Sequence, residues 1–387
     1  MVAPTQAPIG RLAILGCIFT KGATWGTEQS VATGKAVLAT NYGAGDTKPA
    51  QYFSHGAGLK FQQVEYLLDV KGHFEVKFDY RYDGAGPLML SAIMGSDTSP
   101  AVIDTSAYTH TLTWDDYNTA IGTFAMWFGN TNGTLQVLNS CKISSFTLEA
   151  KSNGALHCTV KGLGNRVDIS PAATTTNTAG ILTTLLGAIG ADEIKQGCMF
   201  WHARTLASQN AGFLRIRKVT GSEGNCTSAD DVYLSDWKMT IDRKLKQPDS
   251  QAKEMGEPYE DGQPHFKIDG TIPGFEGNPS DLAGVSYQLI QDLQASFNGS
   301  PVEYKGDFYF ESVALAGAAT AKYSQRHLLP SLAIKMPNPT ISSMGMASTK
   351  IECTGMKAAA APNGSDWTAL TNPLTVKVVN KRATAYT

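Results

Sequence analysis

The residues that could carry chemistry are scattered along this chain of 387 residues. Its seven histidines never show the His-x-x-x-His spacing of a helical metal site, and no Gly-x-Ser-x-Gly nucleophile motif occurs. Gly162-Leu163-Gly164 lacks the third glycine of a dinucleotide-binding loop. Asp115-Asp116 and Asp230-Asp231 could bind a cation, but exposed turns explain them better because adjacent strand residues face opposite sides. Although distant carboxylates could still converge as an acid/base pair, we expect no enzyme, metal or cofactor.

The composition excludes several classes of protein. With 42% hydrophobic and 17% charged residues, the chain can bury the cores of two or three domains, and it is neither disordered nor fibrous. Lys and Arg number 32, and Asp and Glu number 34, without a basic surplus in either half. Because a protein that grips nucleic acid needs concentrated basic residues, we expect no tight binding to DNA.

The cysteines and the start of the chain favour a protein without a disulfide framework or a membrane span. Six cysteines occur, none in a Cys-x-x-Cys pair, and we expect most of them to be reduced core residues rather than disulfides. The apolar stretch Leu12–Phe19 is far shorter than the roughly 20 residues of a bilayer crossing. A signal peptide cleaved at Cys17 is an alternative, but Pro4, Pro8 and Lys21 favour a first β-strand.

Alternation of apolar and polar residues predicts β-strands through most of the sequence. Residues 73–81 have apolar residues on one face and charged residues on the other, and residues 145–151 and 156–161 follow the same pattern. Asn153-Gly154 separates the last two segments and predicts a hairpin, because both residues of a type I′ turn need positive φ. Each strand should therefore have one packed face and one solvated face.

Helical signals are few. Pro87–Gly95 suits a short helix that starts with proline and ends with glycine. A second helix is expected from Ser280 to Phe297, where apolar residues recur at helical spacing. A third candidate, Ile181–Ile189, is interrupted by Gly187.

An internal echo predicts a duplicated unit. Residues 143–161 resemble residues 341–357, with Cys158 and Cys353 at matching places on the apolar side. Upstream, His73-Phe74-Glu75-Val76 resembles His265-Phe266-Lys267-Ile268, and a helix candidate follows in both cases. The repeated order of elements predicts two modules, residues 1–218 and 219–387.

Two polar stretches are longer than ordinary connections. Thr40–Gly58 contains four glycines, and Arg243–Gln263 is rich in charged residues and proline. Connections of this length are often functional or disordered, although ordinary solvated loops explain them equally well.

Several segments resemble the phage tail tube proteins. These segments span about residues 88–272 and comprise Ala92–Gly95, Tyr108-Thr109-His110-Thr111, Cys141–Leu148 with the Asn153-Gly154 turn, and Leu234–Asp242. Residues 165–225 and about the last 25 do not match the pattern. The resemblance implies a mainly β fold with two tandem β-sandwich or barrel modules, each with a short helix, that form part of a closed oligomeric β-barrel.

The resemblance also implies a function and partners. The chain would be the major tail protein of a long-tailed bacteriophage, present in the virion tail and in the host cytoplasm during assembly. It would partner with itself in stacked rings around the tape measure protein, and DNA would later pass through without specific binding. Two modules per chain predict a trimeric ring with pseudo-sixfold symmetry, whereas a single-module interpretation predicts a hexamer.

The same interpretation assigns two sets of residues. The solvated strand faces would line the bore, with Glu75, Lys77, Asp79, Thr147, Glu149, Lys267, Asp269, Lys350 and Glu352, although these residues could equally form plain outer surface. The two long loops would contact the next ring, with Asp46, Lys48, Lys246, Asp249, Lys253 and Glu257.

A different class of function remains open. Asn-x-Ser/Thr sites at Asn132, Asn225, Asn298 and Asn363 are compatible with a secreted or cell-surface β-sandwich adhesin, although three of them are also Asn-Gly turns. A carbohydrate hydrolase is a third alternative.

Overall fold

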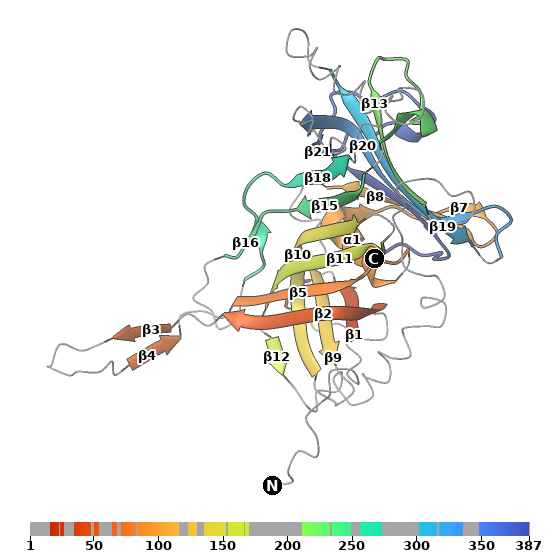
Figure 1. Cartoon of the computed structure of the whole chain (residues 1–387). Helices are drawn as coiled ribbons and strands as arrows, with labels where there is room; N and C mark the ends of the chain where they lie inside the picture. The colour runs from red at the N-terminus through yellow and green to blue at the C-terminus, as the bar shows by residue number, and fades with distance from the viewer. Residues whose placement is uncertain are drawn as a thin grey trace.

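The computed structural model of the chain is mainly β (Figure 1). It describes residues 16–22, 24–26, 35–47, 50–53, 64–67, 71–82, 84–115, 123–129, 135–151, 154–165, 167–169, 211–232, 234–248, 256–272, 302–315, 317–335 and 348–386. The one α-helix in these ranges is α1 (Ala85–Met94), and two short 3-10 helices are η3 (Ser228–Asp230) and η4 (Ser365–Trp367). None of the helices in these ranges has the length and apolar character needed to cross a bilayer.

The strands follow one another along the whole chain. Those before residue 200 are β1 (Gly16–Gly22), β2 (Lys35–Thr47), β3 (Ala50–Phe53), β4 (Val64–Leu67), β5 (Lys71–Asp79), β6 (Gly95–Asp97), β7 (Ala101–Asp104), β8 (Ala107–Trp114), β9 (Thr123–Gly129), β10 (Leu135–Lys151), β11 (His157–Gly164) and β12 (Val167–Ile169). Those after residue 200 are β13 (Ala211–Lys218), β14 (Asp231–Val232), β15 (Asp236–Asp242), β16 (Leu245–Lys246), β17 (Tyr259–Glu260), β18 (His265–Ile272), β19 (Tyr304–Ala314), β20 (Lys322–Lys335), β21 (Thr349–Met356) and β22 (Thr375–Asn380).

The strongest sequence patterns give the expected strands and faces. In β5 the side chains of Phe74, Val76 and Phe78 are buried, while the charged residues between them are exposed or half-buried. β10 and β11 form the predicted antiparallel hairpin, in which Glu149 lies opposite His157. The predicted helix at Pro87–Gly95 is α1, and all its side chains are buried because it lies inside the molecule rather than on its surface.

Eight of these strands form one continuous antiparallel sheet, which we call the long sheet. Its order is β2, β5, β11, β10, β15, β18, β21, β20. The first four and the last four strands follow the same pattern, because in each group the strand order along the sheet is first, second, fourth, third by position in the chain. The β10–β15 pair joins the two groups, with Phe146 opposite Ile241.

The structure aligns the two repeated units differently from the predicted match of Cys158 with Cys353. Phe74 of β5 lies opposite Gly162 of β11, and Phe266 of β18 lies opposite Gly355 of β21. The equivalent of Cys353 is therefore Val160, which lies opposite Val76 as Cys353 lies opposite Ile268. The match of Cys158 with Cys353 was wrong by two residues, because a phenylalanine ring over a glycine fixes the register.

These glycines are required by close packing. A Cβ atom added to Gly162 would lie 2.3 Å from the backbone oxygen of Lys142 and 2.4 Å from the Phe74 ring. We therefore expect Gly162→Ala to lower the free energy of unfolding by about 3 kcal/mol, the upper part of the range for overpacking. Thr159→Ala, on the half-exposed face of the same strand, should change it by less than about 0.5 kcal/mol. Urea unfolding followed by tryptophan fluorescence measures both, and equal values for the two variants would contradict the packing argument.

The long strands β10 and β20 connect the long sheet to a second layer. Residues 135–141 of β10 pair with β9, which pairs in turn with β1. Residues 324–328 of β20 pair with β22, which pairs with β8, and β20 also pairs with β19 and through it with β13. Because β8 belongs to the first half of the chain and β22 to the second, this layer ties the two halves together.

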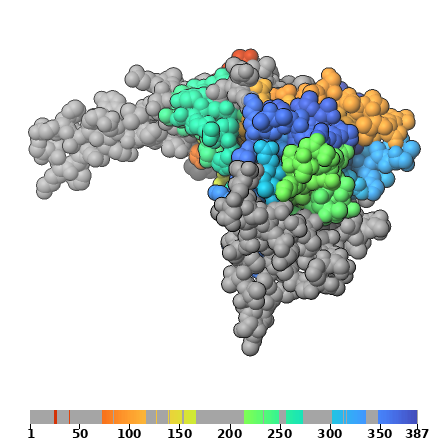
Figure 2. All heavy atoms as spheres, turned by 90° about the horizontal axis from the view of Figure 1, so that it is seen from above, coloured from red at the N-terminus to blue at the C-terminus, as the bar shows by residue number. Residues whose placement is uncertain are grey.

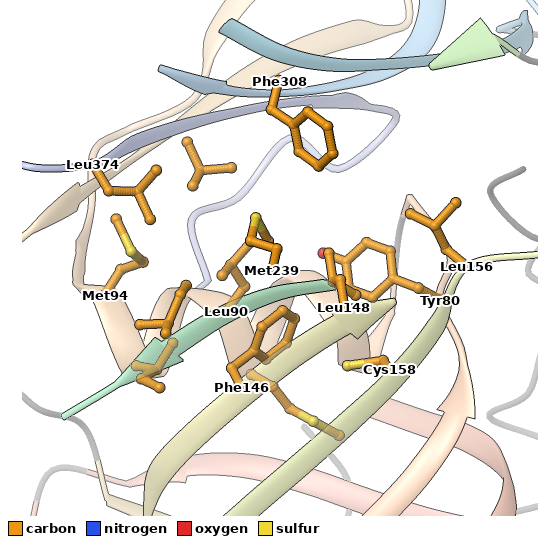
Figure 3. Close-up of a cluster of buried hydrophobic side chains, with 14 of the residues drawn as sticks. Tyr80, Leu90, Met94, Phe146, Leu148, Leu156, Cys158, Met239, Phe308 and Leu374 are labelled. Carbon is orange, nitrogen blue, oxygen red and sulfur yellow. The ribbon is translucent and has the colours of Figure 1, made fainter. Parts of the chain in front are cut away.

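One hydrophobic core fills the space between the layers and around α1. Phe146, Leu148 and Cys158 of the long sheet lie near Leu90 of α1, and Phe308 faces them from the second layer (Figure 3). The core includes residues of both predicted modules. Cys141, Cys158, Cys226 and Cys353 are free and buried, as expected for reduced core residues.

Some sequence expectations need correction or stay open. Thr40–Gly58 is not a single loop, because residues up to Thr47 belong to β2 and residues 50–53 form β3. Gly43 and Gly45 of this stretch lie opposite β5, so pairing outweighs their low β-propensity. The predicted helices at 181–189 and 280–297 lie outside the described residues. The match of residues 143–150 with 341–347 was wrong, because the strand that takes the place of β10 in the second group is β20. β13 pairs with β14 and β19 from beyond residue 218, and the two module ranges stay a prediction.

Candidate functional site

All nine residues predicted to line the bore lie on one face of the long sheet, which we call the polar face. In cross-strand order, Asp79, His157, Glu149, Lys238, Asp269, Glu352 and Lys335 form one row across seven strands. Lys77, Thr159, Thr147, Thr240, Lys267 and Thr354 form the next row. Glu75 and Lys350 lie in the flanking rows, opposite Lys161 and Thr271. The face therefore runs without interruption through both halves of the chain.

Opposite charges on the polar face pair with one another, both within a row and between neighbouring rows. Glu75 Oε1 lies 3.1 Å from Lys77 Nζ, and Glu75 Oε2 lies 3.0 Å from Lys161 Nζ. The hydrogen bonds from these two lysines, with Lys161 contributing most, lower the pKa of Glu75 below its ordinary value. Asp79 accepts a hydrogen bond at 2.8 Å from His157 Nδ1. The first half of the polar face thus compensates its own charge.

The second half repeats this compensation. Lys267 Nζ lies 3.0 Å from Asp269 Oδ1 and 3.2 Å from Glu352 Oε2. The hydrogen bond with Asp269, followed by that with Glu352, raises the pKa of Lys267 above its ordinary value. Each of these surface pairs contributes little to stability, but together they leave a face without a concentrated positive potential.

The polar face is hollowed where the two halves meet. An open hollow of about 870 Å³ is lined by residues of β10, β11, β15, β18 and β21, among them Glu149, His157, Lys238, Asp269 and Glu352. The described residues contain no group of three side chains that could hold a metal ion. The arrangement is a broad, charge-balanced, concave surface rather than a closed catalytic pocket.

Three of the six residues predicted for contacts between rings lie in the described part of the chain. Asp46 belongs to β2, opposite Gly72, and is therefore not in a loop. Lys246 of β16 is exposed and lies 3.3 Å from Asp261, and the exposed Glu257 lies 2.7 Å from Lys142 Nζ. Lys48, Asp249 and Lys253 lie outside the described residues. The base of the 243–260 segment thus packs on its own chain, since Gln247 also donates to Gly72 O at 3.4 Å.

Arg243 anchors this segment to the buried helix. Its side chain is fully buried, and it donates to Ile93 O and Met94 O at 2.6 Å each, and to Asp115 O at 2.7 Å. It also binds Glu260 Oε1 at 2.9 Å, and its guanidinium lies 3.7 Å from the centre of the Trp114 ring. The last carbonyls of a helix have no partner within the helix, so Arg243 serves as a C-terminal cap for α1.

The comparison with protein families bears directly on this surface. Residues 56–192 match the model of the phage tail tube protein family. The match confirms the resemblance found in the sequence and supports a structural role in a phage tail tube, as a component of the virion tail. It covers α1 and the strands β5, β10 and β11, which carry the first half of the polar face. No match to this chain was found among curated proteins.

Sequence reasoning missed part of the polar face. Thr159 and Lys161 of β11, and Asp236, Lys238 and Thr240 of β15, were absent from the predicted set although they lie in the same rows. The alternation Asp236-Trp237-Lys238-Met239-Thr240-Ile241-Asp242 was a sufficient signal for the second strand, because its apolar positions are buried in the structure.

Proposed function

We propose that the chain is the subunit of a phage tail tube, in which the long sheets of neighbouring copies join edge to edge into a ring. The observation that carries the proposal is the single polar face that runs through two groups of four strands with the same spatial order. Joined around a circle, such sheets satisfy one another's edges and present the polar face to a bore.

The repeat also predicts how neighbouring copies pair. Within the described residues, Ala39–Thr47 of β2 pair with β5 alone, and Ala333–Lys335 of β20 pair with β21 alone. If the junction between copies repeats the β10–β15 junction, Ile334 takes the place of Phe146, and Ala44 takes the place of Ile241. Lys335 of one copy then lies opposite Gly43 of the next, on the polar face. Two four-strand groups per chain favour three copies per ring over six.

The proposed bore would suit a channel that DNA crosses without being held. The lysines of the polar face lie among carboxylates, so few of them would bind the phosphates of DNA and release its condensed counterions. A duplex that slides through the bore would therefore not be retained. Stacked rings would enclose the tape measure protein before the DNA passes. The role is structural, so we expect no enzymatic activity and no cofactor.

A disulfide across the proposed junction tests the ring. In the double variant Gly43→Cys and Lys335→Cys, mild oxidation of assembled protein should link neighbouring copies. A non-reducing gel should then show a ladder that ends at the trimer, and averaged end-on micrographs should show closed annuli. A ladder that ends at the hexamer would overturn the trimer, because it counts the copies directly.

A matched control fixes the register. The double variant Ala44→Cys and Lys335→Cys differs by one residue, which places the two thiols on opposite faces of the sheet. It should give less than about one tenth of the cross-linking, since disulfides need Cβ atoms about 4 Å apart. Discrete monomers at high concentration, with no cross-link in either variant, would contradict the proposed function and favour an adhesin.

A further inference from the structure

An exposed apolar tip lies at the end of the molecule where β7 and β8 form a hairpin. Val102 and Ile103 are 69% and 51% exposed, the highest values for large hydrophobic side chains among the described residues. β7 pairs with β8 alone in the described part of the chain, so its second edge carries no described strand. Adjacent exposed apolar residues on an edge strand mark an interaction surface.

Hydrogen bonds from a distant part of the chain position this tip. Asp104 accepts hydrogen bonds from the backbone N–H groups of Ala319 at 2.7 Å and Thr320 at 3.3 Å, in the connection between β19 and β20. The pKa of Asp104 lies below its ordinary value because of the hydrogen bonds from Thr105, Thr320 and Ala319. The two hairpins, orange and light blue in Figure 2, protrude side by side at this end. The bonds from Ala319 and Thr320 join two distant parts of the sequence and fix the position of the β7–β8 hairpin on the molecule.

The hairpin of β3 and β4 is a second segment that lacks a partner among the described strands. It projects from the body on the side opposite to β7 (Figure 1). Its strands pair with each other, with Phe53 opposite Val64 and Gln51 opposite Tyr66, and with no other strand among the described residues. A two-stranded hairpin is marginally stable alone, so one with this apolar sequence needs a partner.

We propose that the tip formed by Val102 and Ile103 is the docking site for the β3–β4 hairpin of another copy of this chain, in the next ring of the tube. The inference rests on the proposed function and adds the acceptor surface for stacking. A head-to-tail contact between two different surfaces at opposite ends of one subunit repeats without limit, as a stacked tube requires. The edge of β7 also offers backbone groups that an incoming strand can pair with.

Charge placed on the tip tests the proposal. The double variant Val102→Asp and Ile103→Asp should form rings as readily as the wild type but lose stacks of two or more rings by at least about tenfold, because it buries charge in an apolar contact. Ala360→Asp places a carboxylate at an exposed loop position and should stack normally. Ring and tube populations are counted by negative-stain microscopy.

A photo-crosslinker identifies the partner segment. With benzoylphenylalanine at position 103, irradiated tubes should yield peptides linked to residues 50–67 of another copy, and unstacked rings should not. Tubes of normal length from the double variant, loss of its rings, or links to other segments would each overturn the proposal. Absence of rings from the wild type would instead contradict the proposed function, so the two failures are distinguishable.

Discussion

Replacing Arg243 by methionine is expected to lower the free energy of unfolding by about 3–5 kcal/mol, the usual cost of breaking a buried ion pair on one side. Methionine fills part of the volume but donates no hydrogen bond. Three backbone carbonyls, including those of Ile93 and Met94 at the end of α1, then lose a donor. The carboxylate of Glu260, which is only 10% exposed, loses its cation.

The measurement is urea unfolding of the unassembled subunit at neutral pH, compared with Lys246→Met. Lys246 lies three residues away and forms an exposed ion pair, so its replacement should cost less than about 1 kcal/mol. Arg243→Lys should be intermediate, because an ammonium keeps the charge but cannot reach all four acceptors in one plane. A loss below about 1 kcal/mol for Arg243→Met would show that water replaces the guanidinium, and that α1 does not depend on this cap.

Arg243 also illustrates what the sequence could not reveal. Its contacts with Ile93 and Met94 join residues about 150 positions apart, and nothing in the local pattern distinguishes it from the solvated residues that follow it. The segment from 243 to 263 was therefore expected to be one long polar loop, either solvated or in contact with the next ring. Its described ends instead pair as β16 and β17 and bind the rest of the chain.

Local periodicity predicted which residues lie on the polar face better than it predicted which strands pair with one another. The alternation in β5, β10, β18 and β21 identified exposed residues that do lie on one face, because a period of two is a property of the strand itself. The order of the strands depends on pairing between distant segments. In β2, Gly43 and Gly45 suggested a loop, yet they pair with Glu75 and His73.

The repeat was visible in the sequence, but its exact register was not. Cys158 and Cys353 suggested the alignment of the two units because cysteine is rare, whereas the structural constraint lies in Gly162 and Gly355. Each glycine leaves room for a phenylalanine ring on the neighbouring strand. Common residues with a steric role carry a weaker sequence signal than rare residues without one.

A second large effect is expected at acidic pH from Glu223, which lies in a buried cluster beside η4. Its Oε2 atom accepts hydrogen bonds from Thr220 N at 3.1 Å and Gly221 N at 2.8 Å, and Oε1 accepts from Asn363 N at 3.0 Å. Lys305 Nζ lies 3.2 Å from Oε1, with both side chains almost fully buried. Burial alone would raise the pKa of Glu223, but these hydrogen bonds outweigh it and lower the pKa to about 2.

The direction of the pH dependence follows from that shift. The unfolded chain takes up the proton near pH 4.5 and the folded chain near pH 2, so the stabilisation is complete above about pH 4.5. It is lost as the pH falls from 4.5 to 2, by about 2–3 kcal/mol in total. The variant Glu223→Gln lacks this pH-dependent stabilisation, because the amide does not titrate. The difference in the free energy of unfolding between wild type and variant should therefore be largest at pH 7 and shrink steadily below pH 4.5.

Urea titrations of both proteins at pH 7, 4.5 and 2.5 give this difference in the free energy of unfolding. The contributions of the other titrating groups cancel in the difference, because both proteins contain those groups. Glu75→Gln is the matched control, since Glu75 also has a lowered pKa but lies on the solvated polar face. Its effect should stay below about 1 kcal/mol at every pH. A difference for Glu223→Gln that is independent of pH would mean that the amide loses only hydrogen bonds, and that the charge of Glu223 does not hold Lys305 in the cluster.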